Sequence, residues 1–475
     1  MDIAPATLDL VFGPDSIGIT AENRAKTSSR MFVQSQDELA VDSSEATGRH
    51  LSAWEAFNAF GFEKLLEAIT HSSAILVTDF RRPASVLQSQ REQLGLSVID
   101  LARELRLTPK DIRNAENSKI RTPIRQLERI ARALGLNEFK LNNTTVESGD
   151  HQLAIRLRTL IDSKHPEFAA KTVMMLDEAA WVTARQAELQ SWLFGENSPH
   201  LIKNFETDSR YGDSLHPAWW YGYRLAEATR KRIGLSSDQP IYSLKTLVEE
   251  LLGVPLIQAR LPKKIAGATI SNGKSRGIIV NIEGENSNVW ARRVTVAHEL
   301  GHLLWDPDQN LSKLRVDLYR DIEQHSSNLH DHVEARANAF AVELLLPQKV
   351  AASRYRNSND LNTTMREIMV EYGISFTSAR FQVWNSLERK IPLTDIFTTN
   401  THPTDDWIGR ESYSLDLFKP ESVPETRRGY FAGLVAAAQQ QGLISIDSAA
   451  SYLGCTIGEY TRSVSVIRGL YPLTL

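Results

Sequence analysis

The pentapeptide His298-Glu299-Leu300-Gly301-His302 limits what this chain can fold into more than any other stretch. It lies in an apolar run from Val294 to Trp305, a composition that favours a buried helix. Because an α-helix has roughly 3.6 residues per turn, histidines four positions apart project from one face and can bind one ion. Glu299 then lies beside the water that such an ion would hold. The pattern predicts a zinc site with a general base; a buried helix with two hydrogen-bonded histidines is the alternative.

A second helical pattern, residues 333–347, provides a third ligand. A catalytic zinc ion takes three protein ligands and leaves its fourth position to water. Glu334 lies at the start of this pattern, far enough after His302 for the chain to turn and bring the second helix alongside the first. His330 and His332 are alternative third ligands from the same stretch.

The two motifs together resemble those of the ImmA/IrrE family of metallopeptidases, which are H-E-L-G-H on an apolar helix and then E-x-x-A-N-x-F-A-x-x-L-L-x-P. The resemblance spans residues 217–390. It implies that His298, His302 and Glu334 bind Zn²⁺ and that Glu299 is the catalytic base, which favours Glu334 over the alternative histidines. It also implies a zinc metalloendopeptidase activity.

Three short segments before the first motif predict a small sheet, at residues 254–257, 267–271 and 277–281, with Asn272-Gly273 as a hairpin turn. A sheet laid against the metal helix is the zincin arrangement. An exposed strand of such a sheet can pair with an extended substrate, and we assign that edge to residues 277–281. The candidates for a donor to the oxyanion are Tyr319, His325, His330, His332 and Arg336.

Residues 86–141 have a different pattern, of short helices separated by tight turns. Ser97 and Thr108 each precede a carboxylate by three positions, the spacing of a capping box, and Thr122-Pro123 is a hydroxyl cap followed by proline. The apolar positions from Leu94 to Gly135 resemble the Xre-type helix-turn-helix of phage-repressor-like regulators.

In such a module, the helix after the turn enters the major groove while nearby helix ends and loops contact phosphates. The resemblance therefore implies these DNA contacts: Lys110, Arg113, Asn114 and Asn117 in the groove, and Ser97, Lys119, Arg121 and Thr122 near the backbone. Arg106 stands where the family often has the turn glycine. Basic residues continue through Arg125, Arg129 and Arg132, which favours DNA binding over a protein-interaction bundle.

The chain of 475 residues, 42% hydrophobic, is too long for a single core, and we expect a multi-domain, mainly α-helical protein. The N-terminal region holds a short strand at 8–12 and a helix at 53–70, and the C-terminal region has the spacing of another helix-turn-helix or of a docking bundle. The predicted parts are an N-terminal region of unassigned role (1–80), the helix-turn-helix (86–141), a helical spacer (150–215), the zincin-like α+β peptidase domain (217–390), a linker (391–424) and a C-terminal helical bundle (425–475).

Charge and cysteine content set the remaining expectations. The formal net charge of −4 argues against a globally basic nucleic-acid coat, although it can hide a local patch. Cys455 is the single cysteine, which excludes an intrachain disulfide and fits the cytoplasm. The N-terminus lacks a signal-peptide pattern, and no stretch approaches the roughly 18 apolar residues of a membrane helix. We therefore expect a cytoplasmic protein with no membrane partner.

Two hypotheses follow for function. The first is a DNA-associated zinc endopeptidase that cleaves a specific repressor-like regulator in a stress, phage or mobile-element response, as the resemblance implies. The second is a non-proteolytic Xre-family regulator or antitoxin-like protein whose zinc domain is a sensor. Glu299 favours the enzyme, because a sensor needs no base beside its ligands. We expect a homodimer, because repressor-like modules usually read paired half-sites.

Overall fold

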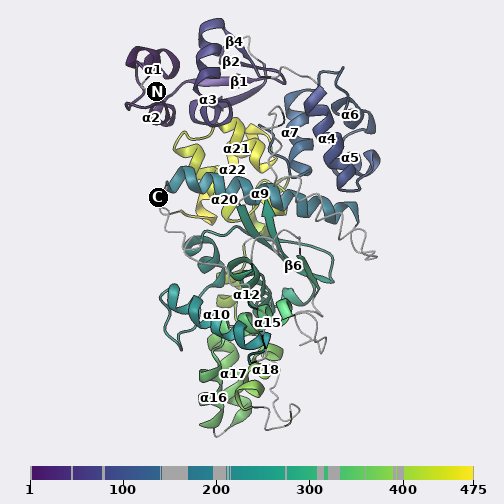
Figure 1. Ribbon diagram of the computed structural model, residues 1–475, viewed down its shortest axis with the longest axis vertical. Helices are drawn as coiled ribbons and strands as arrows, with labels where there is room; N and C mark the ends of the chain where they lie inside the picture. The colour runs from purple at the N-terminus through teal and green to yellow at the C-terminus, as the bar shows by residue number, and fades with distance from the viewer. Residues whose placement is uncertain are drawn as a thin grey trace. The chain divides into compact units, whose positions relative to one another are not determined.

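The computed structural model describes residues 3–43, 47–76, 81–139, 141, 169–195, 210, 213, 215–272, 275–306, 315–318, 332–358, 360–388, 392, 401–413 and 415–473 (Figure 1). The chain forms two compact units. Unit 1 comprises Met1–Ser198, Asn272–Lys274 and Ser414–Leu475, and unit 2 comprises Pro199–Ser271 and Ser275–Tyr413. Within the described ranges, no helix has the length and apolar character needed to cross a membrane.

Unit 1 begins with a small α/β fold. Its sheet is antiparallel, with strand order β3-β1-β2-β4, and the long helix α3 packs on it. The elements are α1 (Pro5–Phe12), α2 (Ala21–Thr27), β1 (Met31–Gln34), β2 (Glu38–Val41), β3 (Arg49–Ser52), α3 (Ala53–His71) and β4 (Ser73–Ile75). Helix α3 confirms the helix predicted at 53–70.

The strand predicted at 8–12 is wrong, because these residues form the second half of α1. Leu8, Val11 and Phe12 are spaced at three and four positions, which is the helical period, and all three are buried. The Phe12 ring lies 6.2 Å from that of Phe57, centroid to centroid. Packing against α3 therefore selects the helix for a segment too short for its sequence pattern to decide.

The helix-turn-helix region contributes four described helices, α4 (Arg81–Gln93), α5 (Val98–Glu104), α6 (Pro109–Ala115) and α7 (Ile124–Ala133). Thr108 and Asp111 form the predicted reciprocal capping box at α6. Ser97 caps α5 by accepting a 3.0 Å hydrogen bond from the Asp100 backbone N–H. The predicted Thr122 cap is wrong: α7 starts one residue later than expected, with Pro123 as N-cap, and the Thr122 N–H donates to Gln36 at 2.8 Å.

Arg106 ends α5 in the left-handed conformation, with φ of 51°. The Leu107 N–H donates to Ala102 O at 2.8 Å, a bond that closes the helix over this residue. A side chain at such a position costs about 1–2 kcal/mol, so we expect Arg106→Gly to raise the free energy of unfolding of unit 1 by about 1 kcal/mol. Arg106→Ala should leave it nearly unchanged. Urea unfolding of both variants checks this, and an equal gain for alanine would show that the arginine side chain, not the backbone, is unfavourable.

Six further described elements belong to unit 1: α9 (Ala170–Phe194), the 3-10 helices η5 (Leu415–Leu417) and η6 (Glu425–Arg427), α20 (Tyr430–Gln440), α21 (Ile446–Leu453) and α22 (Ile457–Leu470). Helix α9 packs against α7, α20 and η6, so it lies inside the unit. Helix α21 packs against β3 and α22. The helix predicted at 153–160 lies outside the described residues.

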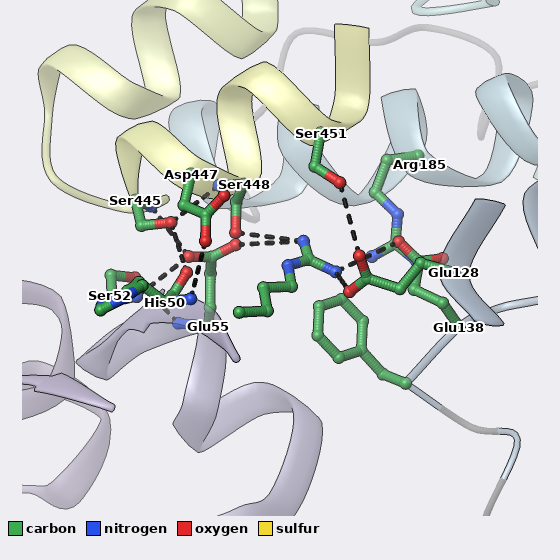
Figure 2. A network of polar contacts seen from close by, with 12 residues as sticks. His50, Ser52, Glu55, Glu128, Glu138, Arg185, Ser445, Asp447, Ser448 and Ser451 are labelled. Atoms are coloured by element: carbon green, nitrogen blue, oxygen red, sulfur yellow. Dashed lines mark hydrogen bonds and ion pairs between the residues drawn. The ribbon is translucent and has the colours of Figure 1, made fainter. Parts of the chain in front are cut away.

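A buried network of ion pairs joins these parts of unit 1 (Figure 2). Arg49 on β3 has no exposed surface, and it pairs with Glu128 of α7 and donates to Ser448 Oγ of α21 at 3.0 Å. Glu138 follows α7 and accepts a 2.9 Å hydrogen bond from the Trp181 indole of α9. The burial of Glu138 alone would raise its pKa, but three neighbouring arginines hold that pKa well below its ordinary value. Helix α7 therefore shares one polar core with the sheet, α9 and α21.

Unit 2 is built around a mixed sheet of strand order β5-β7-β6-β8, with β5 parallel to β7 and β8 antiparallel to β6. Strands β5 (Leu256–Ala259), β6 (Ile265–Asn272) and β7 (Ser275–Asn281) confirm the three predicted strands, and β8 spans Arg315–Leu318. The assignment of residues 277–281 as the exposed edge is wrong, because β7 lies between β5 and β6.

Helices form the rest of the core of unit 2 together with this sheet. They are α10 (Ala218–Arg232), α11 (Leu244–Thr246) with the π-helix η2 (Leu247–Leu251), the 3-10 helix η3 (Gly284–Ser287), α12 (Val289–Trp305), α15 (His332–Leu345), α16 (Gln348–Arg356), α17 (Leu361–Tyr372), α18 (Phe376–Ser386) and α19 (Asp405–Glu411). Helix α12 packs on β7.

Helix α19 lies within residues 391–424, the predicted linker. Its Trp407 side chain nevertheless belongs to the core of unit 2. Trp407 is buried and its indole donates to Val370 O at 2.8 Å. The Glu411 carboxylate accepts hydrogen bonds from the backbone N–H groups of Leu244 and Lys245, at 2.8 and 3.0 Å, and so caps α11. Contacts with distant residues therefore order a segment whose own composition is typical of a loop.

Candidate metal centre

Helix α12 carries the H-E-L-G-H motif and is buried along almost its whole length. Its N-cap residue, Asn288, accepts hydrogen bonds from the backbone N–H groups of Trp290 and Ala291. The sheet packs on α12 through β7, and α15 packs on α12 as well. The motif histidines therefore lie inside unit 2, facing the helix that carries Glu334.

Two glycines allow α15 to lie close to its neighbours α12 and α10. A Cβ atom at Gly301 of α12 would lie 2.7 Å from the Phe340 ring. A Cβ atom at Gly222 of α10 would lie 2.3 Å from the Arg336 carbonyl oxygen. Neither contact is sterically allowed, so a side chain at either position would push α15 away and move Glu334 with it.

The three ligands predicted from the sequence converge. His298 Nε2 and His302 Nε2 are 3.1 Å apart, and the Glu334 carboxylate lies 3.2 Å from the first and 3.4 Å from the second. Among the described histidines, cysteines and carboxylates, these three residues form the group whose ligand atoms lie within 4.8 Å of one another. Two imidazole nitrogens and one carboxylate oxygen are the donor set of an open zinc site.

The structure does not place the alternative third ligands in the cluster of described residues. His332 is exposed at the first turn of α15 and does not belong to the cluster. His330, Tyr319 and His325 lie outside the described residues.

A second carboxylate, which the sequence interpretation missed, orients one of the ligands. Asp306 Oδ2 lies 2.9 Å from His302 Nδ1, and Arg336 Nη2 lies 2.5 Å from Asp306 Oδ1. Metal-binding histidines usually hold their other ring nitrogen against a carboxylate in this way. The signal was available, because Asp306 follows His302 by one helical turn. Arg336 was a candidate for the oxyanion donor; it is buried and pairs with Asp306 instead.

These carboxylates set the charge of the cluster. Burial alone would lower the pKa of His302, but Glu334 and Asp306 reverse the effect and raise it to about 9. Burial would raise the pKa of Glu334, yet the two imidazoles hold it well below its ordinary value. The ionised Glu334 carboxylate therefore lies against imidazoles that favour the protonated state. A divalent cation can take the place of these protons between the three side chains.

Glu299 lies on the side of α12 that faces β6. Its side chain is completely buried, and Oε2 accepts a 2.7 Å hydrogen bond from the Thr269 hydroxyl. A Cβ atom at Gly267, two residues earlier on β6, would lie 3.3 Å from Glu299 Oε1. Thr269 thus fixes the direction of the predicted base, and Gly267 leaves the space that its carboxylate occupies. No pattern in the sequence pointed to these two residues, because their role depends on how β6 crosses α12.

Glu343 lies on α15, the helix that carries Glu334, and its protonation makes the stability of unit 2 depend on pH. Burial raises its pKa from 4.5 to about 7, although its Oε2 accepts hydrogen bonds from Gln348 N and Gln382 Nε2. The folded state therefore prefers the neutral acid, and its stability is full below pH 4.5 and falls as the pH rises through about 7.

Glu343→Gln should remove this dependence, because a neutral amide oxygen can accept the same two hydrogen bonds. We expect the substitution to raise the free energy of unfolding by about 2–3 kcal/mol at pH 8 and by almost nothing at pH 4. The size follows from the pKa shift, since each pKa unit corresponds to about 1.4 kcal/mol. Urea unfolding at both values is the measurement, with Glu367→Gln, at an exposed glutamate of α17, as control. A gain that is the same at both pH values would contradict the pKa assignment.

The predicted DNA contacts fall into two groups. Four of them, on α6 or in the turn that follows it, are exposed or partly exposed: Lys110, Arg113, Asn114 and Asn117. Of those near the backbone, Lys119 is exposed, Ser97 caps α5, and Arg121 pairs with Asp37 at 2.7 Å while 77% of its side chain stays exposed. The predicted contact at Thr122 is wrong, because this residue is buried. The surface of α6 is therefore accessible to a groove.

The basic run on α7 extends that surface only in part. Arg125 pairs with Asp447 of α21, and Arg129 donates to the Leu105 carbonyl oxygen. Arg132 is buried and pairs with Glu138 at 3.0 Å. Burial therefore excludes Arg132 as a DNA contact, whereas Arg125 and Arg129 stay exposed and each also contacts another element of unit 1.

Comparison with known protein families agrees with both motifs. Residues 263–383 match the model described as the IrrE N-terminal-like domain of Peptidase_M78, and this range includes β6, α12 and α15. Residues 87–141 match a helix-turn-helix model. A search of curated proteins found no match. The chain thus combines an Xre-type helix-turn-helix domain with an IrrE N-terminal-like domain of Peptidase_M78.

Proposed function

We propose that this chain is a zinc-dependent endopeptidase with a DNA-binding helix-turn-helix, and that it cleaves a specific repressor-like regulator in a stress, phage or mobile-element response. One observation carries the proposal: the ligand atoms of His298, His302 and Glu334 lie within 4.8 Å of one another. Glu299, buried next to His298 on the same helix, provides a base. The mixed sheet packed on α12 supports a zincin-like fold for this domain.

The residues of the site divide the chemistry between them. A zinc ion bound by the three ligands would act as a Lewis acid toward a peptide carbonyl group. Glu299 takes a proton from the attacking water and returns it to the leaving amine. Thr269 holds one oxygen of that carboxylate at 2.7 Å, so the side chain keeps its direction while it exchanges the proton. Asp306 keeps the His302 ring oriented through Nδ1.

The metal content of the purified chain tests the site. Elemental mass spectrometry should find about one zinc per chain, and Glu334→Ala should lose it, because two imidazoles alone bind far more weakly. Glu343→Gln, another substitution on α15, is the matched control and should keep the zinc. A chain without zinc, or a Glu334→Ala variant that retains it in full, would contradict the three-ligand site.

The DNA part of the proposal makes its own prediction. Lys110→Ala with Arg113→Ala should weaken DNA binding and reduce the slope of log K against log salt by about 0.9 for each phosphate that the variant no longer neutralises. Arg354→Ala, an exposed arginine of unit 2 that pairs with Glu371, is the control and should leave the slope unchanged. Titration of the chain against fluorescent duplex DNA at several salt concentrations measures both. An unchanged slope in the double variant would place the DNA surface elsewhere.

A further inference from the structure

Strand β6 is the strand that contacts the proposed base, and its outer side is covered by β8. The two strands pair antiparallel, with Gly267 opposite Asp317, Ala268 opposite Val316 and Thr269 opposite Arg315. Since β8 is last in the strand order, β6 would be the edge of the sheet without it. The register is irregular between Ile265 and Gly267, a bulge of the kind often found at sheet edges and next to active sites.

The covered part of β6 is the part closest to Glu299. Thr269 donates to the Glu299 carboxylate, and a side chain at Gly267 would meet it at 3.3 Å. An open edge presents unpaired N–H and C=O groups, and an extended peptide can add to them as a further strand. A peptide added to β6 at Gly267–Thr269 would therefore run beside the base, where its backbone could reach the metal cluster. β8 occupies this position.

We propose that the outer backbone edge of β6 at Gly267–Thr269 is a binding site for an extended, unfolded polypeptide segment, and that β8 is its internal occupant, which a substrate must displace. The site would select substrates with an exposed unstructured segment over fully folded ones. The exchange is feasible because β8 is only four residues long and the incoming peptide remakes the same ladder of hydrogen bonds. The role of this site in catalysis rests on the proposed endopeptidase function, but peptide binding to it does not.

The test weakens β8 through its backbone. Neighbouring residues of a strand direct their N–H groups to opposite sides, so Val316→Pro with Asp317→Pro removes a ladder donor whichever of the two faces β6. Val316→Ala with Asp317→Ala removes the same side chains and keeps both N–H groups, which makes it the matched control. All chains carry Glu299→Gln, so that no probe is cleaved.

The probe is a fluorescein-labelled peptide that copies residues 311–320, and its anisotropy reports binding. We expect the double-proline chain to bind it at least tenfold more tightly than the double-alanine chain, and a scrambled peptide to bind neither. Hydrogen exchange at β6 should rise in the double-proline chain and fall again when the peptide is added. Equal affinity of both chains for the peptide, with unchanged circular dichroism, would overturn the proposal.

A second pair of variants protects the test against misfolding of the proline chain. Ala268→Cys with Val316→Cys, in a Cys455→Ser background, places two thiols at register partners of β6 and β8. The oxidised form should bind no peptide, and reduction should restore binding to the level of the parent chain. Peptide binding that survives oxidation would overturn the proposal. Normal peptide binding in this test, together with no protein cleavage by the chain that keeps Glu299, would contradict the proposed function alone.

Discussion

Under the proposed endopeptidase function, we expect Glu299→Gln to slow peptide-bond cleavage between about a hundredfold and ten-thousandfold, the range that general acid–base catalysis contributes. Glutamine keeps the size of the side chain and can still accept the hydrogen bond from Thr269. It cannot take a proton from water. His298, His302 and Glu334 are unchanged, so the zinc content should stay the same. The measurement is the number of new protein N-termini in cells that express the chain, found by N-terminal labelling and mass spectrometry.

Two matched variants make this result specific. Glu343→Gln replaces another buried glutamate of unit 2, outside the ligand cluster, and should cleave as the parent chain does. Thr269→Val removes the hydroxyl that holds Glu299 and should give an intermediate rate, because the base remains but its direction is no longer fixed. If the Glu299→Gln chain produces the same N-termini as the parent, the endopeptidase proposal is wrong and a zinc-binding regulator becomes the better interpretation.

Arg49→Met will destabilise unit 1 by about 3–5 kcal/mol, the usual cost of removing one partner of a buried ion pair. Arg49 has no exposed surface and lies among three carboxylates, with Glu55 at 3.9 Å, Glu138 at 3.7 Å and Glu128 paired directly. Methionine fills a similar volume but removes one of the buried cations that offset these carboxylates in a low-dielectric interior, and Arg132 and Arg185 remain. Hydrogen exchange of α7 and α21 measures the loss, because both helices contact this network.

The control for this prediction is an ion pair of similar geometry on the surface. Arg103 pairs with Asp100 at 2.8 Å, and 62% of its side chain is exposed. Arg103→Met should change the free energy of unfolding by no more than about 0.5 kcal/mol. DNA binding should fall in the Arg49→Met chain as well, since α7 belongs to the helix-turn-helix domain. If hydrogen exchange shows that Arg49→Met lowers the stability of α7 by less than about 1 kcal/mol, the network does not hold this helix in place.

Much of the candidate metal site could be predicted from the sequence, because its signals are local. The spacing of His298 and His302 fixes both side chains on one face of a helix, whatever the rest of the chain does. The pattern that begins at Glu334 is helical by the same argument, and the structure brings its carboxylate to the two histidines. The short β-branched segments before the first motif were equally clear, and they form β5, β6 and β7. Hydroxyl caps located the starts of α5 and α6.

Only the tertiary structure decided how these elements use one another. Arg125, Arg129 and Arg132 look the same in sequence as Arg113, but their partners lie on other elements, and Arg125 reaches Asp447, more than three hundred positions away. Thr269 matters because β6 crosses Glu299. Strand β7 is interior because β5 and β6 flank it, and β6 is interior because β8 returns to it from beyond the first motif. A periodic pattern fixes which face of a helix or strand is buried. Ion pairs and sheet edges depend on which distant segment occupies the neighbouring space, and no local pattern carries that information.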